Sequence, residues 1–137
     1  MKHDVWGVFH DGILVRIDGT VPGDLVLRIQ IEYLRNQFDE SGDYFIIELG
    51  CCTKFRYSEY DNPPTEELSE IQAREIDLLY VSSEQPLVLD CSMGVLELEY
   101  ESMRVLLPSG RTVTRDELIA ASENYWNEWG QRAKNAT

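Results

Sequence analysis

The amino-acid sequence predicts an α+β fold: a strongly bent antiparallel β-sheet, or a partly open barrel, of about six or seven strands with one C-terminal amphipathic helix. Three observations lead to this prediction. Short apolar–polar alternations, separated by turn signals, recur from residue 13 to residue 107. The strongest helix signals come after them, from residue 113 onward. The chain of 137 residues has the size of one domain, so we expect residues 1–137 to share a single core.

The first two predicted strands have different signals. Residues 13–17 are mostly apolar and are flanked by Asp11-Gly12 and Asp18-Gly19, which are typical turn sequences. Residues 25–33 have the clearest pattern in the chain, because their odd positions are almost wholly apolar and their even positions mostly polar. This alternation is typical of a strand with one face in the core and the other in water.

The next predicted strand, residues 44–57, follows a loop at residues 36–43. One face of this run would carry six side chains: Phe45, Ile47, Leu49, Cys51, Phe55 and Tyr57. Fourteen residues is long for one strand, and Gly50 lies near the middle. A glycine inside a strand commonly marks a bulge or a close approach of another backbone, and we expect the run to bend there.

Residues 59–77 interrupt the strand pattern. The sequence Asn62-Pro63-Pro64 cannot continue a β-ladder, because proline has no N–H to donate. From Glu66 onward the apolar residues partly fit a helix and partly fit a strand. We expect a strand at about residues 75–81 and leave the preceding residues open.

Two further strands are predicted before the helix, at residues 87–91 and 95–107. In the second, the apolar positions are even-numbered up to Tyr100 and odd-numbered from Met103. A change of parity inside one run indicates a bulge or a break, which we place at Glu101-Ser102.

The predicted helix covers residues 115–129. Thr114 and Glu117 have the spacing of a capping box, in which each side chain satisfies a free backbone N–H at the start of the helix. Val113 and Leu118 are spaced for the hydrophobic staple that often accompanies it.

The sequence also predicts where this helix ends and where its aromatic residues lie. Gly130 is expected to terminate it, and residues 131–137 to be frayed. Tyr125, Trp126 and Trp129 continue the apolar stripe at helical spacing, so we expect these aromatic side chains to lie in the core.

The charge balance narrows the choice of partners. The chain has 12 Lys and Arg against 25 Asp and Glu, a net charge of −13. A protein this negative repels phosphate groups and anionic lipid, so neither nucleic acid nor a membrane surface is an expected partner. A basic protein would be attracted instead.

Seven acidic residues and one basic residue, Arg74, lie within residues 59–77. Irregular segments on a rigid scaffold are common recognition sites. We therefore assign partner binding to acidic residues of this segment and to two from the strand at 95–107: Glu59, Asp61, Glu66, Glu67, Glu70, Glu97 and Glu99.

The three cysteines predict a reducing environment. Cys51 and Cys52 are adjacent on a predicted strand and Cys91 is alone, so no disulfide framework is expected. All three are predicted to be buried, reduced and inert. The N-terminus has no apolar run of signal-peptide length, and no segment approaches the length of a membrane span, so we expect a cytoplasmic protein.

No residue pattern predicts catalysis, and we assign no catalytic residue, cofactor or metal ligand. His10-Asp11 is explained as part of a turn, and His3 with His10 lacks a third ligand at a diagnostic spacing. Glu97, Glu99 and Glu101 would share one strand face, which is first of all typical of a solvated surface.

Two short motifs carry a resemblance: Trp6-x-x-Phe9-His10-Asp11-Gly12 near the start and Tyr125-Trp126-x-x-Trp129 in the helix. The chain resembles small bacterial single-domain proteins of the immunity type that accompany polymorphic toxins. The resemblance implies an acidic, cytoplasmic, partner-binding domain and transfers no functional residue.

These observations favour a non-enzymatic acidic interaction module that binds a basic protein, as an immunity-like protein would. One alternative is a β-domain that binds a small ligand on the concave face of its sheet. Another is an uncommon enzyme without a standard motif.

Overall fold

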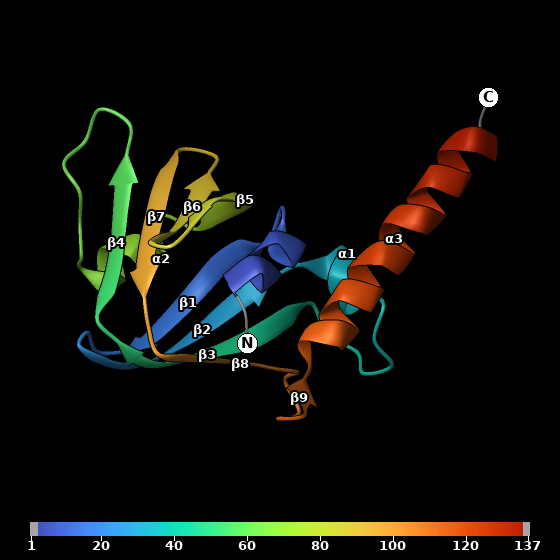
Figure 1. The fold of residues 1–137 in the computed structure, drawn as a ribbon, viewed down its shortest axis with the longest axis horizontal. Coiled ribbons are helices and arrows are strands. Elements are labelled where there is room, and N and C mark those ends of the chain that lie inside the picture. The colour runs from blue at the N-terminus through green and yellow to red at the C-terminus, as the bar shows by residue number, and fades with distance from the viewer. Residues whose placement is uncertain (1–2, 136–137) are drawn as a thin grey trace.

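A computed structural model describes residues 3–135, with side-chain surroundings for residues 5–132. The fold is α+β, as predicted: one open antiparallel sheet and a C-terminal helix (Figure 1). The strands are β1 (Ile13–Gly19), β2 (Gly23–Gln30), β3 (Tyr44–Cys52), β4 (Lys54–Glu59), β5 (Ile76–Glu84), β6 (Leu87–Cys91), β7 (Gly94–Glu99), β8 (Ser102–Leu106) and β9 (Thr112–Val113). The helices are η1 (His3–Phe9, a 3₁₀-helix), α1 (Glu32–Arg35), α2 (Leu68–Ala73) and α3 (Arg115–Asn135).

The nine strands have the order β4-β7-β6-β5-β1-β2-β3-β8-β9. β3 pairs with β8 and β4 pairs with β7, although β4 directly follows β3 and β8 directly follows β7. The two long runs therefore bend together, at Thr53 in one and at Tyr100-Glu101 in the other. The predicted break at Glu101-Ser102 is confirmed to within a residue. The predicted strand number was too low because each run counts as two strands and β9 was not foreseen.

The core lies between the two halves of the bent sheet. In β2, Leu25, Leu27 and Ile29 are buried while their neighbours are partly or fully exposed, so the predicted alternation is confirmed. The strand is shorter than predicted, since it ends at Gln30 and Tyr33 lies in α1. The N-terminal η1 packs against this core through Phe9, whose ring centroid is 5.7 Å from that of Phe45.

The burial pattern changes parity near the bend of β3. Phe45, Ile47 and Leu49 are buried as expected, but the next buried side chain is that of Cys52 and not that of Cys51. Cys51 has a φ angle of 52°, in the left-handed region, and the register between β2 and β3 shifts nearby. This irregularity turns the Cys51 side chain to the solvent, so its predicted burial was wrong.

The segment that the sequence left open forms a turn and a short helix. Thr65 pairs with Tyr57 of β4 through two backbone hydrogen bonds of 2.9 and 3.0 Å, so the loop after β4 covers part of that edge strand. α2 then places Ile71 in the core. The following strand, β5, begins at Ile76 as expected and continues beyond the predicted end, to Glu84.

The start of α3 matches its prediction. Thr114 N–H donates to Glu117 Oε1 and Glu117 N–H donates to Thr114 Oγ1, each at 3.1 Å, which confirms the capping box. The two staple residues, Val113 and Leu118, are fully buried.

The end of α3 differs from its prediction. The helix continues through Gly130 to Asn135, because this glycine keeps a helical backbone instead of the left-handed one that ends helices. Fraying after residue 131 stays a prediction, and residues 136 and 137 lie outside the described part. The helix extends away from the sheet, and only its first half lies beside other elements (Figure 1).

This projection overturns the predicted burial of the aromatic residues. Trp126 is 44 % exposed and Trp129 is 54 % exposed, and Tyr125 is half-buried. The helix face that carries the buried residues Leu118 and Ala121 continues to Trp129. The rest of the protein covers only the first part of this face.

Candidate functional site

Four aromatic side chains form a continuous cluster between α1 and α3, which we call the aromatic cluster: Tyr33, Tyr125, Trp126 and Trp129. The ring centroids of Tyr33 and Tyr125 are 4.4 Å apart, and those of Tyr125 and Trp126 are 5.0 Å apart. Trp126 and Trp129 follow at 6.1 Å with an edge-to-face geometry. The cluster therefore runs from a half-buried base on α1 to an exposed end on α3.

Tyr33 fixes the base of the aromatic cluster. Its hydroxyl donates a hydrogen bond of 2.6 Å to the backbone oxygen of His10, which ties α1 to the turn before β1. Burial, with smaller contributions from Asp11 and Tyr125, raises the pKa of Tyr33 to about 12. The phenol thus keeps its proton at neutral pH and remains a donor to that carbonyl.

A groove of about 490 Å³ adjoins the aromatic cluster at Tyr33. Its other lining residues come from the turn before β1, from β1 and β2, and from α1: Asp11, Ile13, Gln30, Ile31, Glu32 and Asn36.

The turn that supplies Asp11 is held by several hydrogen bonds. Asp11 has a φ angle of 69°, and its N–H donates to Leu78 O at 2.8 Å. His10 Nδ1 lies 2.5 Å from Leu79 O, and His10 Nε2 lies 3.5 Å from Asp11 Oδ2. These contacts fit the structural interpretation of His10-Asp11 as a turn that anchors to β5.

The acidic residues assigned to partner binding are dispersed and partly paired. Glu59 forms an ion pair of 2.9 Å with Arg74, and Glu70 accepts a hydrogen bond of 2.9 Å from Thr65 Oγ1. Glu97 pairs with Lys54 at 2.8 Å. The remaining assigned residues are exposed: Asp61, Glu66, Glu67 and Glu99.

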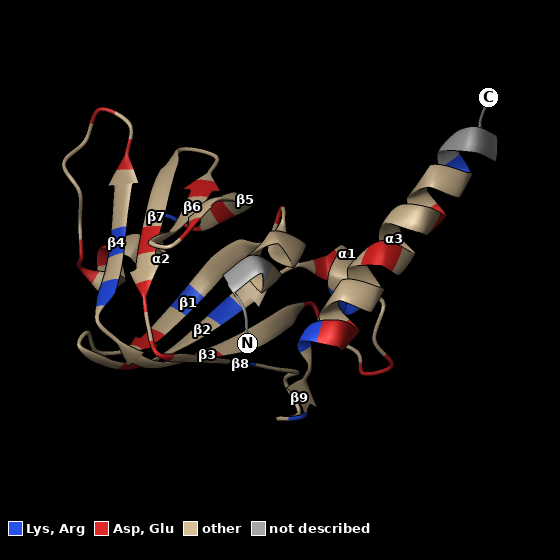
Figure 2. Ribbon diagram, in the orientation of Figure 1, with Lys and Arg blue, Asp and Glu red and all other residues tan. Residues whose placement is uncertain are grey.

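Cations interrupt the acidic surface around β4. In the β4–β7 ladder, Glu97 lies opposite Arg56 and Glu99 lies opposite Lys54, and Glu97 and Glu99 hold the pKa of Lys54 above its usual value. Figure 2 shows these basic residues on β4 beside the acidic ones on β7. β4 and α2 lie at one end of the long axis of the molecule and α3 lies at the other (Figure 1), so the assigned residues do not join the aromatic cluster.

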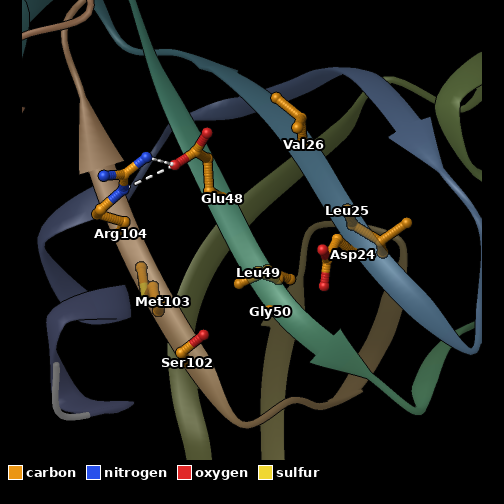
Figure 3. Close-up of a pocket in the computed structure, with 9 residues that line it drawn as sticks. All are labelled: Asp24, Leu25, Val26, Glu48, Leu49, Gly50, Ser102, Met103 and Arg104. Carbon is orange, nitrogen blue, oxygen red and sulfur yellow. Dashed lines mark hydrogen bonds and ion pairs between the residues drawn. The ribbon is translucent and has the colours of Figure 1, made fainter.

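A second groove, of about 420 Å³, lies on the outer face of the sheet across β2, β3 and β8 (Figure 3). Arg104 Nε donates to Glu48 Oε1 at 2.7 Å along its wall, and a second bond joins Arg104 Nη2 to the same oxygen. A Cβ at Gly50 would lie 2.1 Å from Ser102 Oγ, so a side chain at this position would displace the Ser102 hydroxyl. In the sequence, Gly50 indicated a bulge, a bend or a close approach of another segment, and it did not predict a groove.

The thiols are poorly suited to nucleophilic chemistry. Cys52 and Cys91 are buried, and burial raises the pKa of Cys91 to about 12 and also raises that of Cys52. Cys51 is exposed, but a hydrogen bond with Glu101 raises its pKa. All three thiols are therefore mostly protonated at neutral pH, which lowers their reactivity.

Within the described residues, no three or more His, Cys, Asp and Glu side chains gather as a metal site would require. The His3 side chain lies outside this part of the structure. None of the helices in residues 3–135 combines the length and apolar character needed to cross a bilayer.

No family model, curated protein or solved structure matches the chain. The site must therefore be judged on its own geometry. The aromatic cluster is its most distinctive feature, because two tryptophans are exposed on a helix whose first half is packed. Sequence analysis identified these residues but placed them in the core, since helical spacing is the same for a covered and an uncovered stripe.

Proposed function

We propose that the protein is a non-enzymatic interaction module that binds a basic protein partner at the aromatic cluster. The observation that carries this proposal is the exposure of Trp126 and Trp129 at the end of a packed aromatic row. Tryptophan is among the residues most enriched in binding hot spots, where truncation commonly costs about 2 kcal/mol or more. Proteins commonly present such residues on the apolar face of a helix, where the rest of the protein does not cover that face.

The electrostatics favour a basic partner over a second copy of the chain. Each copy carries a net charge of −13, so two copies would repel one another. Acidic residues are spread over both halves of the sheet, the loop after β4 and α3 (Figure 2). Glu123 and Glu128 are exposed on α3 itself, beside the aromatic row. A basic surface with an apolar centre would complement both features.

We further propose an immunity-like role in the cytoplasm. The resemblance of the two aromatic motifs to immunity proteins supports it, as do the three free cysteines, which suit a reducing compartment. In this role the module would cover a basic surface of a toxin and prevent its activity by occlusion, which needs no catalytic group on the module.

Affinity capture with matched variants tests the proposal. The parent protein, a double variant Trp126→Ala with Trp129→Ala, and a control Tyr80→Ala with Met93→Ala would be used as bait in host lysate. The control removes two other exposed apolar side chains, which are 58 % and 64 % exposed and lie on β5 and in the turn before β7. We expect a basic protein that the parent and the control retain and the double variant loses. Equal retention by all three baits would exclude the aromatic cluster from the interface.

A small-ligand-binding function is the second candidate, and the groove in Figure 3 is the observation that favours it. The inner face of the sheet is filled by the core, so such a ligand would bind on the outer face and not on the concave one. Val26→Phe would fill the groove from its exposed wall without changing a core position. A compound that raises the melting temperature of the parent but not of this variant would support ligand binding; a compound that stabilises both equally would not.

A further inference from the structure

We infer that the groove beside Tyr33 receives an arginine side chain of the basic partner while Trp126 and Trp129 bind its apolar residues. The inference rests on the proposed function and adds the chemistry of the residue that the groove selects. Three features of the groove carry it: its acceptor-rich lining, its aromatic wall and its continuity with the aromatic cluster.

The polar lining of the groove suits a ligand with several hydrogen-bond donors and a positive charge. Asp11 and Glu32 contribute exposed carboxylates, and Gln30 and Asn36 contribute amide oxygens. None of the seven residues that line the groove is Lys, Arg or His. An anionic ligand would therefore meet like charge, whereas a cation would find compensating groups on more than one side.

Arginine fits this lining better than lysine does. A guanidinium presents five N–H donors in a plane, so it can bond to acceptors that are spread along a groove while its face lies on an aromatic ring. Tyr33 supplies that ring, since it lines the groove and packs against Tyr125 on α3. A lysine ammonium is a compact charge and would reach fewer of these acceptors at once.

The groove is joined to the exposed tryptophans and is held in shape. The ring centroid of Tyr33 lies 6.1 Å from that of Trp126, so one short peptide segment can contact both. A hydrogen bond to Leu78 fixes the backbone of Asp11, and a hydrogen bond to His10 O fixes the Tyr33 side chain. A site whose groups are already in place loses little entropy on binding, which favours selectivity.

Peptide titrations followed through the indole N–H signals test the inference. The probes are a short unstructured peptide containing leucine and arginine, a twin with lysine for arginine, and a twin with uncharged citrulline. Trp126 and Trp129 report on the aromatic cluster. Trp6 is an internal control, because it is 3 % exposed and its Nε1–H donates to Tyr100 Oη at 2.9 Å. We expect the arginine peptide to shift the indole N–H signals of Trp126 and Trp129 and to leave that of Trp6 unchanged. We expect its affinity to be about tenfold higher than that of either twin.

A matched pair of variants locates the arginine. The double variant Asp11→Asn with Glu32→Gln should lower the affinity for the arginine peptide by about tenfold. It should leave the affinity for the citrulline peptide nearly unchanged. Asparagine is chosen because it tolerates the left-handed backbone of Asp11. The control, Glu66→Gln with Glu67→Gln, removes the same charge from the loop before α2 and should change the affinity less than about twofold at physiological salt.

The outcomes separate this inference from the proposed function. Equal affinity for the arginine and lysine peptides, equal effects of the two variant pairs, or no binding of the arginine peptide would each overturn the inference. If the lysine peptide shifts Trp126 and Trp129 as strongly as the arginine peptide does, the aromatic cluster remains a binding surface without an arginine site. If a captured basic partner binds without any involvement of the two tryptophans, the proposed interface fails as well.

Discussion

The three tryptophans occupy two different environments in this protein. Trp6 is buried beside Phe9, with ring centroids 6.0 Å apart, and its indole N–H is satisfied by Tyr100. Trp129 is more than half exposed and contacts Trp126 edge-to-face. The energetic value of Trp6 lies in folding, whereas that of Trp129 is available for binding.

This difference predicts that the two tryptophans contribute unequally to stability. Trp129→Ala should change the free energy of unfolding by less than about 1 kcal/mol, because no cavity is created in the core. Trp6→Ala should cost about 3–5 kcal/mol through lost burial and a cavity. Urea unfolding of both variants measures the two values. A loss for Trp129→Ala as large as that for Trp6→Ala would show that the end of α3 packs on the body in solution.

The thiols give a second prediction at the residue scale. The thiolate is the reacting species, so a raised pKa slows labelling at neutral pH and lets the rate keep rising at more alkaline pH. Cys52 and Cys91 should stay unlabelled until the protein unfolds, and Cys51 alone should react with a thiol reagent in the native state. Glu101→Gln should speed the labelling of Cys51, because it removes the carboxylate that raises the thiol pKa. Rapid native labelling of two or more thiols would contradict the account.

Among the elements, α3 combines a fully predictable start with an unpredictable end. The capping box depends on two residues three positions apart, so local sequence was enough to locate it. Thr114→Ala should cost about 1 kcal/mol of stability, and Thr114→Ser much less, because serine restores the hydroxyl. Thermal unfolding of the two variants measures this difference. Equal losses for alanine and serine would mean that the cap contributes little.

In the strands too, features set by local sequence were predicted, and features set by contacts with distant segments were not. Flanking turn signals identified β1 and alternation identified β2. The change of parity near residue 101 identified the break between β7 and β8. The exposure of Cys51 could not be foreseen, because it follows from a backbone irregularity against β2. α1 and β9 were also missed, since elements this short produce no period of their own.

At the scale of the whole molecule, the sequence did not reveal how far the body extends along α3. Tyr125, Trp126 and Trp129 have the spacing of a core stripe, and whether such a stripe is covered depends on the position of η1 and α1. Sequence reasoning therefore chose the acidic segment after β4 as the binding surface and assigned the aromatic cluster to the core. The structure places the two at opposite ends of the long axis (Figure 1).

The acidic segment retains a predicted role in the approach of a partner. Glu66, Glu67 and Glu70 are exposed, so their replacement by glutamine should leave the fold intact. It should slow association with a basic partner at low salt and matter less at physiological salt, where the Debye length is about 8 Å. Association rates at two ionic strengths, for the parent and the triple variant, measure this effect. Equal rates at low salt would remove the segment from the encounter, and a loss of folding would show that these carboxylates are structural.

Hydrogen exchange of the free protein and of its complex with the captured partner tests the central claim most directly. It compares two regions of the same molecule in one experiment: residues 122–132 of α3, which carry the exposed tryptophans, and residues 59–70, which carry the acidic segment. The account predicts that the partner slows amide exchange along 122–132 and leaves 59–70 nearly unchanged. Slowing at 59–70 with no change along α3 would contradict it and would return the binding surface to the acidic segment.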